Sequence, residues 1–587
     1  PANYFLVGPA VVSALSFANP LNSLTIGLNF GGDTLQFGSL DPGFRASILI
    51  NALAQNDVVI GQDMNLPGQD IAITGGAISV SDGVVISTRK VNGNGEAVGD
   101  AGDITLEGKS ITIGAGAELR AEVEEGSVWS AGAITLAASN TAVTPAIQLI
   151  YGSRGATIEI GTGAQLQGGD ISITAEAGDA APEELDSKFL TILENYTIGA
   201  LETILVDNIS LPLAAMVKEA NARVEVGADC QILSSGQVSL EAGANADGTV
   251  KAISGGLDPL SGVPVLNVFS IAFSMADAQA ETLIHPGVLI AAAGDVRIAA
   301  DAEATASATA RTSENLGTYP GNRDAMAISI AVADSTTTSH VTLSAGAEIH
   351  SGGNVSLAAA GTSTNIASAE TGVYDNGFAG ISVGLGFSDT EIIADIRGIV
   401  TAEGRATPDD QEDVEGIRVY AGLESKEISS AVSGLKGDPL IKDALLKGEV
   451  ATVLPSIVQG TMGKLRDAAG TNNYFEPGSF LSSLSLAGTV AYANIDNVVT
   501  ASIAGSAELK SKMDIVVDAR ITDRVQTAAE SVISGQSSDE GEETADSALS
   551  AAVIVGDYTN HVTAEIAGGA QLNARRDMDI TATLSYP

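Results

Sequence analysis

The sequence predicts an all-β fold, a β-solenoid of stacked coils with two inserted helical segments. Three observations lead to this prediction. A five-residue pattern of apolar, any, apolar, any and small residues recurs along the 587 residues. A Gly-Ala signature recurs ahead of it. Aromatic residues make up only 4% of the chain while hydrophobic residues reach 45%, which fits a narrow core filled by Ile, Val, Leu and Ala.

The five-residue pattern has the period of a strand. In Ile71-Ala-Ile73-Thr-Gly75 the two apolar side chains fall on one side and the polar residues on the other. The first three copies start 33 and 30 residues apart, and most later copies start about twice that distance apart. We therefore predict that the first residue of each copy and its i+2 partner point into the core. The first residues in question are Ile171, Val238, Val296, Val355, Ile515 and Met578.

Two turn signatures separate the strands. One is the Gly-Ala signature, as in Leu343-Ser-Ala-Gly-Ala-Glu-Ile349, and the other is Gly followed by Asp or Asn, as in Gly353-Asn354. Glycine beside Asp or Asn allows the positive φ of a tight corner. In the later units a third, small apolar run such as 325–333 comes first and a polar turn follows it. At roughly 20–25 residues per coil and about 4.8 Å of rise, we expect about 20 coils and a rod about 100 Å long.

Two segments have the spacing of helices instead. Residues 182–206 begin with Pro182 and two glutamates, and apolar residues follow at helical intervals. Residues 438–454 begin with Asp438 and Pro439, and we expect both segments to be helical and packed outside the coils. The predicted organisation is an irregular N-terminal solenoid region at 1–60, short-repeat solenoid at 61–181, a helical insertion at 182–221, long-repeat solenoid at 222–425, a helical insertion at 426–480 and solenoid at 481–587.

Charge excludes several classes of function. The chain has 28 Lys and Arg against 72 Asp and Glu, a net charge of -44. Nucleic-acid binding needs a positive surface, and anionic membrane surfaces would repel this chain. No apolar run approaches the length of a membrane-spanning helix, so membrane insertion is not expected. The chain begins Pro-Ala-Asn-Tyr and ends just after a repeat signature, so we interpret it as a segment of a longer protein.

Two acidic loops are the candidate metal sites. Carboxylate oxygens are the ligands that Ca²⁺ prefers, although neither loop has the spacing of a helix-loop-helix calcium site. A solvated loop is the other interpretation of each, because runs of like charge usually face water. Calcium is thus the one cofactor that the sequence offers. The candidate ligands are Asp409, Asp410, Glu412 and Asp413 in the first loop and Asp539, Glu540, Glu542 and Glu543 in the second.

Three other chemically suggestive features are interpreted as scaffold. The string around Ser382, Gly-Ile-Ser-Val-Gly, matches a nucleophile elbow, but it lies in a strand-like apolar run. Cys230 replaces the alanine of the Gly-Ala signature and, as the only cysteine, forms no intrachain disulfide. His340 and His561 both precede Val-Thr, which suggests one repeated position. No catalytic residue is predicted.

The joined units, such as Ala325 through Ala359, resemble the repeats of large filamentous bacterial adhesins of the filamentous haemagglutinin-like and leukotoxin type. The resemblance covers roughly residues 60–587. It implies a right-handed parallel β-helix, export, and an extracellular location on the cell surface, in a Gram-negative bacterium.

Three hypotheses for function follow. The first is a non-catalytic stalk segment of a giant surface adhesin, with a cell-surface receptor or glycan as partner. The second is a self-assembling subunit of an extracellular fibre, sheath or surface layer, whose partner is the chain itself, end to end or laterally. The third is a β-helix polysaccharide lyase or hydrolase, which needs clustered acids and a basic residue.

Overall fold

The chain is a parallel β-helix. The computed structural model describes residues 5–7, 19–28, 32–38, 40–41, 43–124, 127–141, 150–178, 185–186, 209–210, 213–254, 267–312, 325–371, 377–404, 416–436, 484–534 and 547–587, and these residues contain strands and no helix. The strands form three sheets, which we name A, B and C. From β5 onward each coil passes through one strand of sheet A, one of sheet C and one of sheet B, and then enters the next coil; the two coils before it have no described strand in sheet C.

Sheets A and B each follow a path of twelve described strands, and sheet C has ten. Neighbouring strands pair in parallel except β1 and β3, which are antiparallel. Sheet A contains β1 (Phe5–Val7), β3 (Thr34–Phe37), β5 (Asp57–Ile60), β8 (Ala77–Val80), β11 (Ser110–Ile113), β14 (Ile150–Ile160), β19 (Leu213–Val226), β22 (Asn267–Ile284), β25 (Ala325–Leu343), β28 (Gly377–Ile396), β31 (Leu484–Ile503) and β34 (Ser547–Ile566), with β18 (Ile209–Ser210) beside β22.

Sheet B contains β2 (Ser23–Leu28), β4 (Ser47–Ala52), β7 (Ile71–Thr74), β10 (Ile104–Gly108), β13 (Ile134–Thr141), β16 (Ile171–Gly178), β21 (Val238–Ser254), β24 (Val296–Thr312), β27 (Val355–Thr371), β30 (Gly416–Lys436), β33 (Asp514–Ser534) and β36 (Met578–Ser585), with β17 (Leu185–Asp186) beside β21. Sheet C contains β6 (Met64–Asn65), β9 (Val85–Ser87), β12 (Glu118–Arg120), β15 (Gln165–Gly168), β20 (Gln231–Ser234), β23 (Leu289–Ala292), β26 (Glu348–Ser351), β29 (Ile399–Ala402), β32 (Glu508–Ser511) and β35 (Gln571–Ala574).

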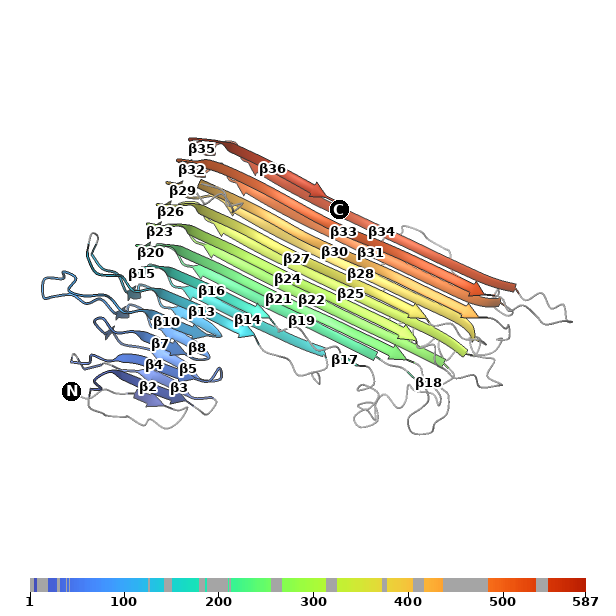
Figure 1. Ribbon diagram of the computed structural model, residues 1–587, viewed down its shortest axis with the longest axis horizontal. Coiled ribbons are helices and arrows are strands. Elements are labelled where there is room, and N and C mark those ends of the chain that lie inside the picture. Colours follow the sequence, from blue (N-terminus) through green and yellow to red (C-terminus); the bar gives the residue numbers. More distant parts are fainter. Residues whose placement is uncertain are drawn as a thin grey trace.

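The strands lengthen along the chain, so the solenoid is a widening plate rather than a rod. β5, β7 and β8 have 4 residues each, whereas β30 and β33 have 21. Figure 1 shows the short N-terminal strands opening into the long strands of the C-terminal coils. Twelve coils rise by about 55 Å, and a strand of 20 residues spans about 65 Å. The expectation of about 20 coils and a rod of about 100 Å is therefore wrong.

The error has a physical reason. Each unit of about 60 residues is one coil with two long strands and one short one. The polar stretch after the third apolar run, Asp334 to Ser339, was expected to be a turn, but it lies inside the single strand β25. Serine and threonine side chains resemble turn residues in sequence, yet threonine is also common in strands. Composition alone does not separate the two cases.

The register prediction is confirmed for the buried coils. Ile171, Val238, Val296, Val355 and Ile515 occupy one ladder position in sheet B, and each is at most 1% exposed. Their i+2 partners are equally buried. Met578 and Ile580 continue the ladder in β36, the last described strand of sheet B, where they are 45% and 47% exposed.

The corners show why the turn signatures recur. The glycine before the second alanine of the Gly-Ala signature has positive φ, for example 64° at Gly116 and 83° at Gly346. At the other corner an Asp or Asn side chain joins successive coils. Asp295 Oδ1 accepts a hydrogen bond from the Asn354 backbone N–H at 2.7 Å, and Asn354 Oδ1 accepts one from Gly416 at 2.8 Å. The Gly-Asp motif thus satisfies backbone donors where the sheet ladder is interrupted.

The interior narrows away from sheet C. Next to sheet C it is filled by Ile, Val and Leu, such as Leu343, Ile349 and Leu357, which are fully buried. Farther along the long strands the inward residues are mainly Ala, Ser, Thr and Gly, so sheets A and B approach each other closely. At Gly384 a β-carbon would collide with the Ser430 backbone carbonyl oxygen of the facing strand.

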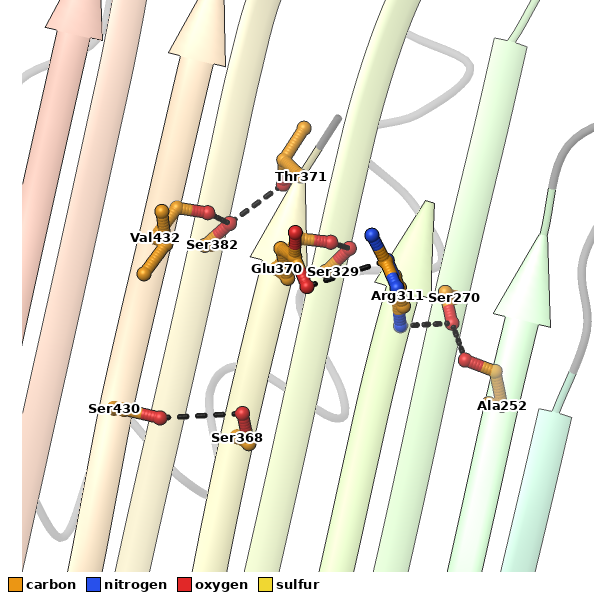
Figure 2. Close-up of polar contacts among 10 residues, drawn as sticks. All are labelled: Ala252, Ser270, Arg311, Ser329, Ser368, Glu370, Thr371, Ser382, Ser430 and Val432. Carbon is orange, nitrogen blue, oxygen red and sulfur yellow. Dashed lines mark hydrogen bonds and ion pairs between the residues drawn. The ribbon is translucent and has the colours of Figure 1, made fainter. Parts of the chain in front are cut away.

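Buried hydroxyl groups join the two sheets near their far ends. Ser270, Ser329, Ser382 and Thr489 are in register along sheet A and at most 1% exposed. Ser329 Oγ donates to the Glu370 carbonyl oxygen at 2.7 Å, and Ser382 Oγ donates to the Val432 carbonyl oxygen at 2.6 Å (Figure 2). The facing ladder in sheet B consists of Thr312, Thr371, Ser433 and Ser531.

The predicted helices fall mostly outside the described residues. Within 182–206 the structure describes only β17, which is a strand paired with β21. The outer parts of the two predicted insertions are strands, because 213–221 belong to β19 and 426–436 belong to β30. Residues 187–206 and 438–454 lie outside the described residues.

The aliphatic ladder predicts a large effect of charge at Leu357. Replacing Leu357 by Asp should destabilise the protein by several kcal/mol, since the carboxylate has no partner among Ile298, Val419 and their neighbours. Ser356, one residue earlier, points outward, so Ser356→Asp is the matched control and should change stability by about 0.5 kcal/mol or less. Chemical unfolding of both variants tests this, and equal midpoints for L357D and the parent would contradict it.

The hydroxyl ladder predicts a smaller effect at Ser382. Ser382→Ala should destabilise by about 1 kcal/mol, because the Val432 carbonyl oxygen loses a buried donor. Ser430→Ala removes a hydroxyl from the outer face of the same region and serves as control. Urea unfolding curves of the two variants give the comparison. A cost at Ser430 as large as that at Ser382 would show that the inter-sheet hydrogen bonds are not the source.

Candidate functional site: the outer face of sheet A

The sequence-predicted calcium loops are not placed by the structure. Residues 409–413 and 539–543 both lie outside the described residues. Among the described residues, no group of three or more His, Cys, Asp or Glu side chains is arranged to hold a metal ion. The two loops therefore remain a prediction.

Ser382 and Cys230 have the scaffold positions expected for them. Ser382 is fully buried within β28, and its hydroxyl is engaged with the facing sheet. Cys230 is also fully buried, and its thiol donates to the Gly161 carbonyl oxygen at 3.0 Å. Burial raises the pKa of the Cys230 thiol, so the thiolate is disfavoured at neutral pH.

The histidines are distributed over the outer surface. His285 Nε2 lies 2.7 Å from Glu225 Oε1, and His350 Nε2 lies 3.3 Å from Glu348 Oε2. His340 and His561 were expected to share one repeat position. The sheet A register instead aligns His340 with Thr563. The two positions differ by two residues, because the segment between His561 and its Gly-Ala signature is two residues longer.

The feature that sequence reasoning missed is the direction of the large side chains in the third apolar run. In β22, Ser270, Ala272 and Ser274 point inward and are fully buried. The alternating residues Ile271 and Phe273 therefore point outward. The same holds in the neighbouring strands, so the outer face of the far half of sheet A is apolar. We name this surface the apolar face: Ile271, Phe273, Met275, Ile328, Ile330, Val332, Ile381, Val383, Leu385, Phe387, Val490, Tyr492, Val553 and Val555.

The apolar face is continuous across five strands. The Phe387 and Tyr492 rings pack at a centroid distance of 5.6 Å, tilted by 51°. Leu385 and Tyr492, paired in register, are only 2% and 3% exposed, while Val553 in the last strand is 47% exposed. A sheet that is apolar on both faces is typical of one that packs against another layer. Of the residues of the apolar face, Val553 in the last strand is the one with a largely exposed side chain, so the exposed apolar area is greatest at β34.

Acidic residues border the apolar face on the side nearest sheet C. Asp277, Asp389 and Asp496 share one register position on the outer surface. Burial, together with the charges of Asp496 and Glu391, raises the pKa of Asp389. The border therefore concentrates negative charge beside a surface made of Ile, Val and Phe. Such a border disfavours contact with anionic surfaces.

The alternation was visible in the sequence. Phe269-Ser-Ile-Ala-Phe-Ser-Met-Ala alternates large and small residues, and the inward side of a thin solenoid accepts only the small ones. Because the run was interpreted simply as apolar, its two faces were not distinguished.

Comparison with known protein families, with curated proteins and with solved structures found no match to this chain. No helix long and apolar enough to cross a membrane occurs among the described residues.

The buried thiol predicts slow alkylation. Cys230 in the folded protein should react with a maleimide or iodoacetamide far more slowly than an exposed thiol at pH 7.5, and full reactivity should appear on unfolding in urea. Because burial raises the thiol pKa, the thiolate fraction should stay low as the pH approaches the ordinary thiol value. Rapid labelling of the native protein would contradict the buried placement.

Proposed function

We propose that the chain is a non-catalytic, extracellular structural segment of a large bacterial surface adhesin. It holds other parts of that protein at a distance from the cell and contacts its surroundings through flat β surfaces. The observation that supports this best is the stiff parallel β-helix with a continuous apolar face on sheet A. A broad β face of this kind suits contact along its length rather than enclosure of a small substrate.

The apolar face also favours the second candidate, a self-assembling subunit of a fibre, sheath or surface layer. Two copies packed through sheet A would remove large aliphatic and aromatic groups from water. The acidic border, by contrast, would repel a like border unless the two copies were offset or antiparallel. Lateral association is thus the mode of self-contact that we propose, alongside contact with a cell-surface receptor or glycan.

Association can be tested with outward substitutions on the apolar face. The double variant Ile330→Glu and Val383→Glu should lower self-association, while unfolding should change little because both side chains point outward. Thr338→Glu adds charge on the polar half of the same strand and serves as control. Sedimentation velocity over a concentration series, with electron microscopy, provides the measurement. Equal association in all three proteins would exclude the apolar face as the contact.

The non-catalytic assignment has a separate test. The purified chain is incubated with acidic and neutral polysaccharides, esters and peptides, and products are followed by reducing-end and chromatographic assays. We expect no turnover with any of them. Turnover that disappears on changing a single Asp or Glu would overturn the assignment and favour the polysaccharide lyase or hydrolase hypothesis.

A further inference from the structure

A polar seam runs through the interior of the long-strand coils. At the matching positions of earlier coils the inward residues are small, such as Ala304 and Ala306 of β24. In the next coils of sheet B the same ladder positions hold Ser363 and Asn365, and then Ser425 and Glu427. All four of these polar side chains are at most 4% exposed.

Glu427 is the most unusual member of the seam. It is fully buried, and neither carboxylate oxygen has a hydrogen-bond partner. Asn365 lies directly beside it in register on β27 and is also fully buried. The Asn365 amide nitrogen donates to the Phe387 carbonyl oxygen, which turns Oδ1 away from that carbonyl and leaves it without a partner. Two acceptors with no donor are thus placed side by side.

The facing strand makes room for these oxygens. Gly386 of β28 sits between alanines in its ladder, at Ala333 and Ala493. A β-carbon on Gly386 would collide with Glu427 Oε1 and would lie 3.1 Å from Asn365 Oδ1. Both oxygens therefore lie over the same point of sheet A. Oxygens bound to one Ca²⁺ lie at most about 5 Å apart, and this arrangement meets that limit.

A second acidic group lies on the next coil. Asp523 of β33 is 1% exposed and is in register with Ser425, two residues before Glu427. Its Oδ2 accepts a hydrogen bond from Asn560 Nδ2 at 3.1 Å, and the Ser425 hydroxyl also donates to the carboxylate, while Oδ1 has no partner. Asn497 donates to Asn560 Oδ1 at 2.8 Å and likewise keeps an unpartnered oxygen. The seam contains unsatisfied oxygens and no basic side chain among those described.

We propose that Glu427, Asn365 and Asp523 bind a divalent cation of the calcium type inside the solenoid, between sheets A and B. Carboxylate and amide oxygens are the hard ligands that Ca²⁺ prefers, and two carboxylates neutralise its charge. Buried carboxylates without a counter-charge are costly. Burial, together with the charges of Asp523 and Asp334, raises the pKa of Glu427.

A single proton is the competing way to neutralise this pair. A protonated Glu427 could donate to Asn365 Oδ1, but one such bond leaves the other Glu427 oxygen, Asp523 Oδ1 and Asn497 Oδ1 without partners. Glu427 Oε1 and Asn365 Oδ1 lie over the same point of sheet A, so a cation there can contact both oxygens at once. This convergence favours the cation.

The experiment compares thermal unfolding in Ca²⁺ and in chelator at fixed ionic strength. Calcium at millimolar concentration should raise the Tm of the parent by about 3 °C. Glu427→Gln should melt above the parent in chelator, because a buried charge has been removed, and should lose the calcium response. Glu424→Gln, three residues earlier on the outer face of β30, removes the same charge and should keep the response. Asp523→Asn should weaken it.

Each alternative gives a distinct result. An equal calcium response in the parent and E427Q would place calcium on exposed acids and overturn the proposal. No response in the parent, together with a more stable E427Q, would show that the carboxyl is neutralised by a proton. An equal shift with Na⁺ alone would overturn the divalent assignment. None of these results bears on whether the chain is an adhesin segment.

Discussion

The volume of the inward side chains determines the shape of this protein. Where Leu343 and Leu357 fill the interior, sheets A and B are held apart and the third sheet closes the coil. Where alanine, serine and glycine take over, the sheets close on each other and continue as two long layers. The close approach is also what lets Ser329 and Ser382 reach backbone carbonyl groups across the interior. The long strands, the narrow interior and the hydrogen bonds between sheets A and B therefore all result from the small size of the inward side chains.

The same constraint explains the apolar face. A strand that pairs on both edges favours β-branched and aromatic residues, but a thin interior cannot hold them. In β22 the large residues Phe273 and Met275 accordingly lie outside, while Ala272 and Ser274 lie inside. The inversion leaves the larger apolar area on the outer surface. Further packing against that surface would contribute hydrophobic stabilisation that the core itself cannot supply.

Much of the fold could be predicted from the sequence, because the period-2 pattern around Val355 and Leu357 and the glycine corners around Gly346 depend on local chemistry. The number of residues in one coil could not be predicted from the sequence. Whether Asp334 to Ser339 turns or extends depends on a facing strand 28 residues later, as the contact of Ser335 Oγ with Ser363 Oγ shows. The side of the strand on which Phe273 lies depends on the distance between sheets A and B, because only small side chains fit between them. Such information is tertiary and is not encoded in one segment.

Repeated coils are expected to be equivalent to one another, and equivalent coils do not form a singular site. Ser382 and Cys230 fit this expectation, because both are buried and each hydroxyl or thiol donates to a backbone carbonyl oxygen. One inward ladder position is not equivalent from coil to coil. It holds Ala304 in β24, Ser363 in β27, Ser425 in β30 and Asp523 in β33. Each step adds a polar group to a layer that excludes water, and a half-satisfied polar interior is less stable than an apolar one. The buried Glu427, whose carboxylate oxygens have no hydrogen-bond partner, is the observation from which we propose a ligand for this seam.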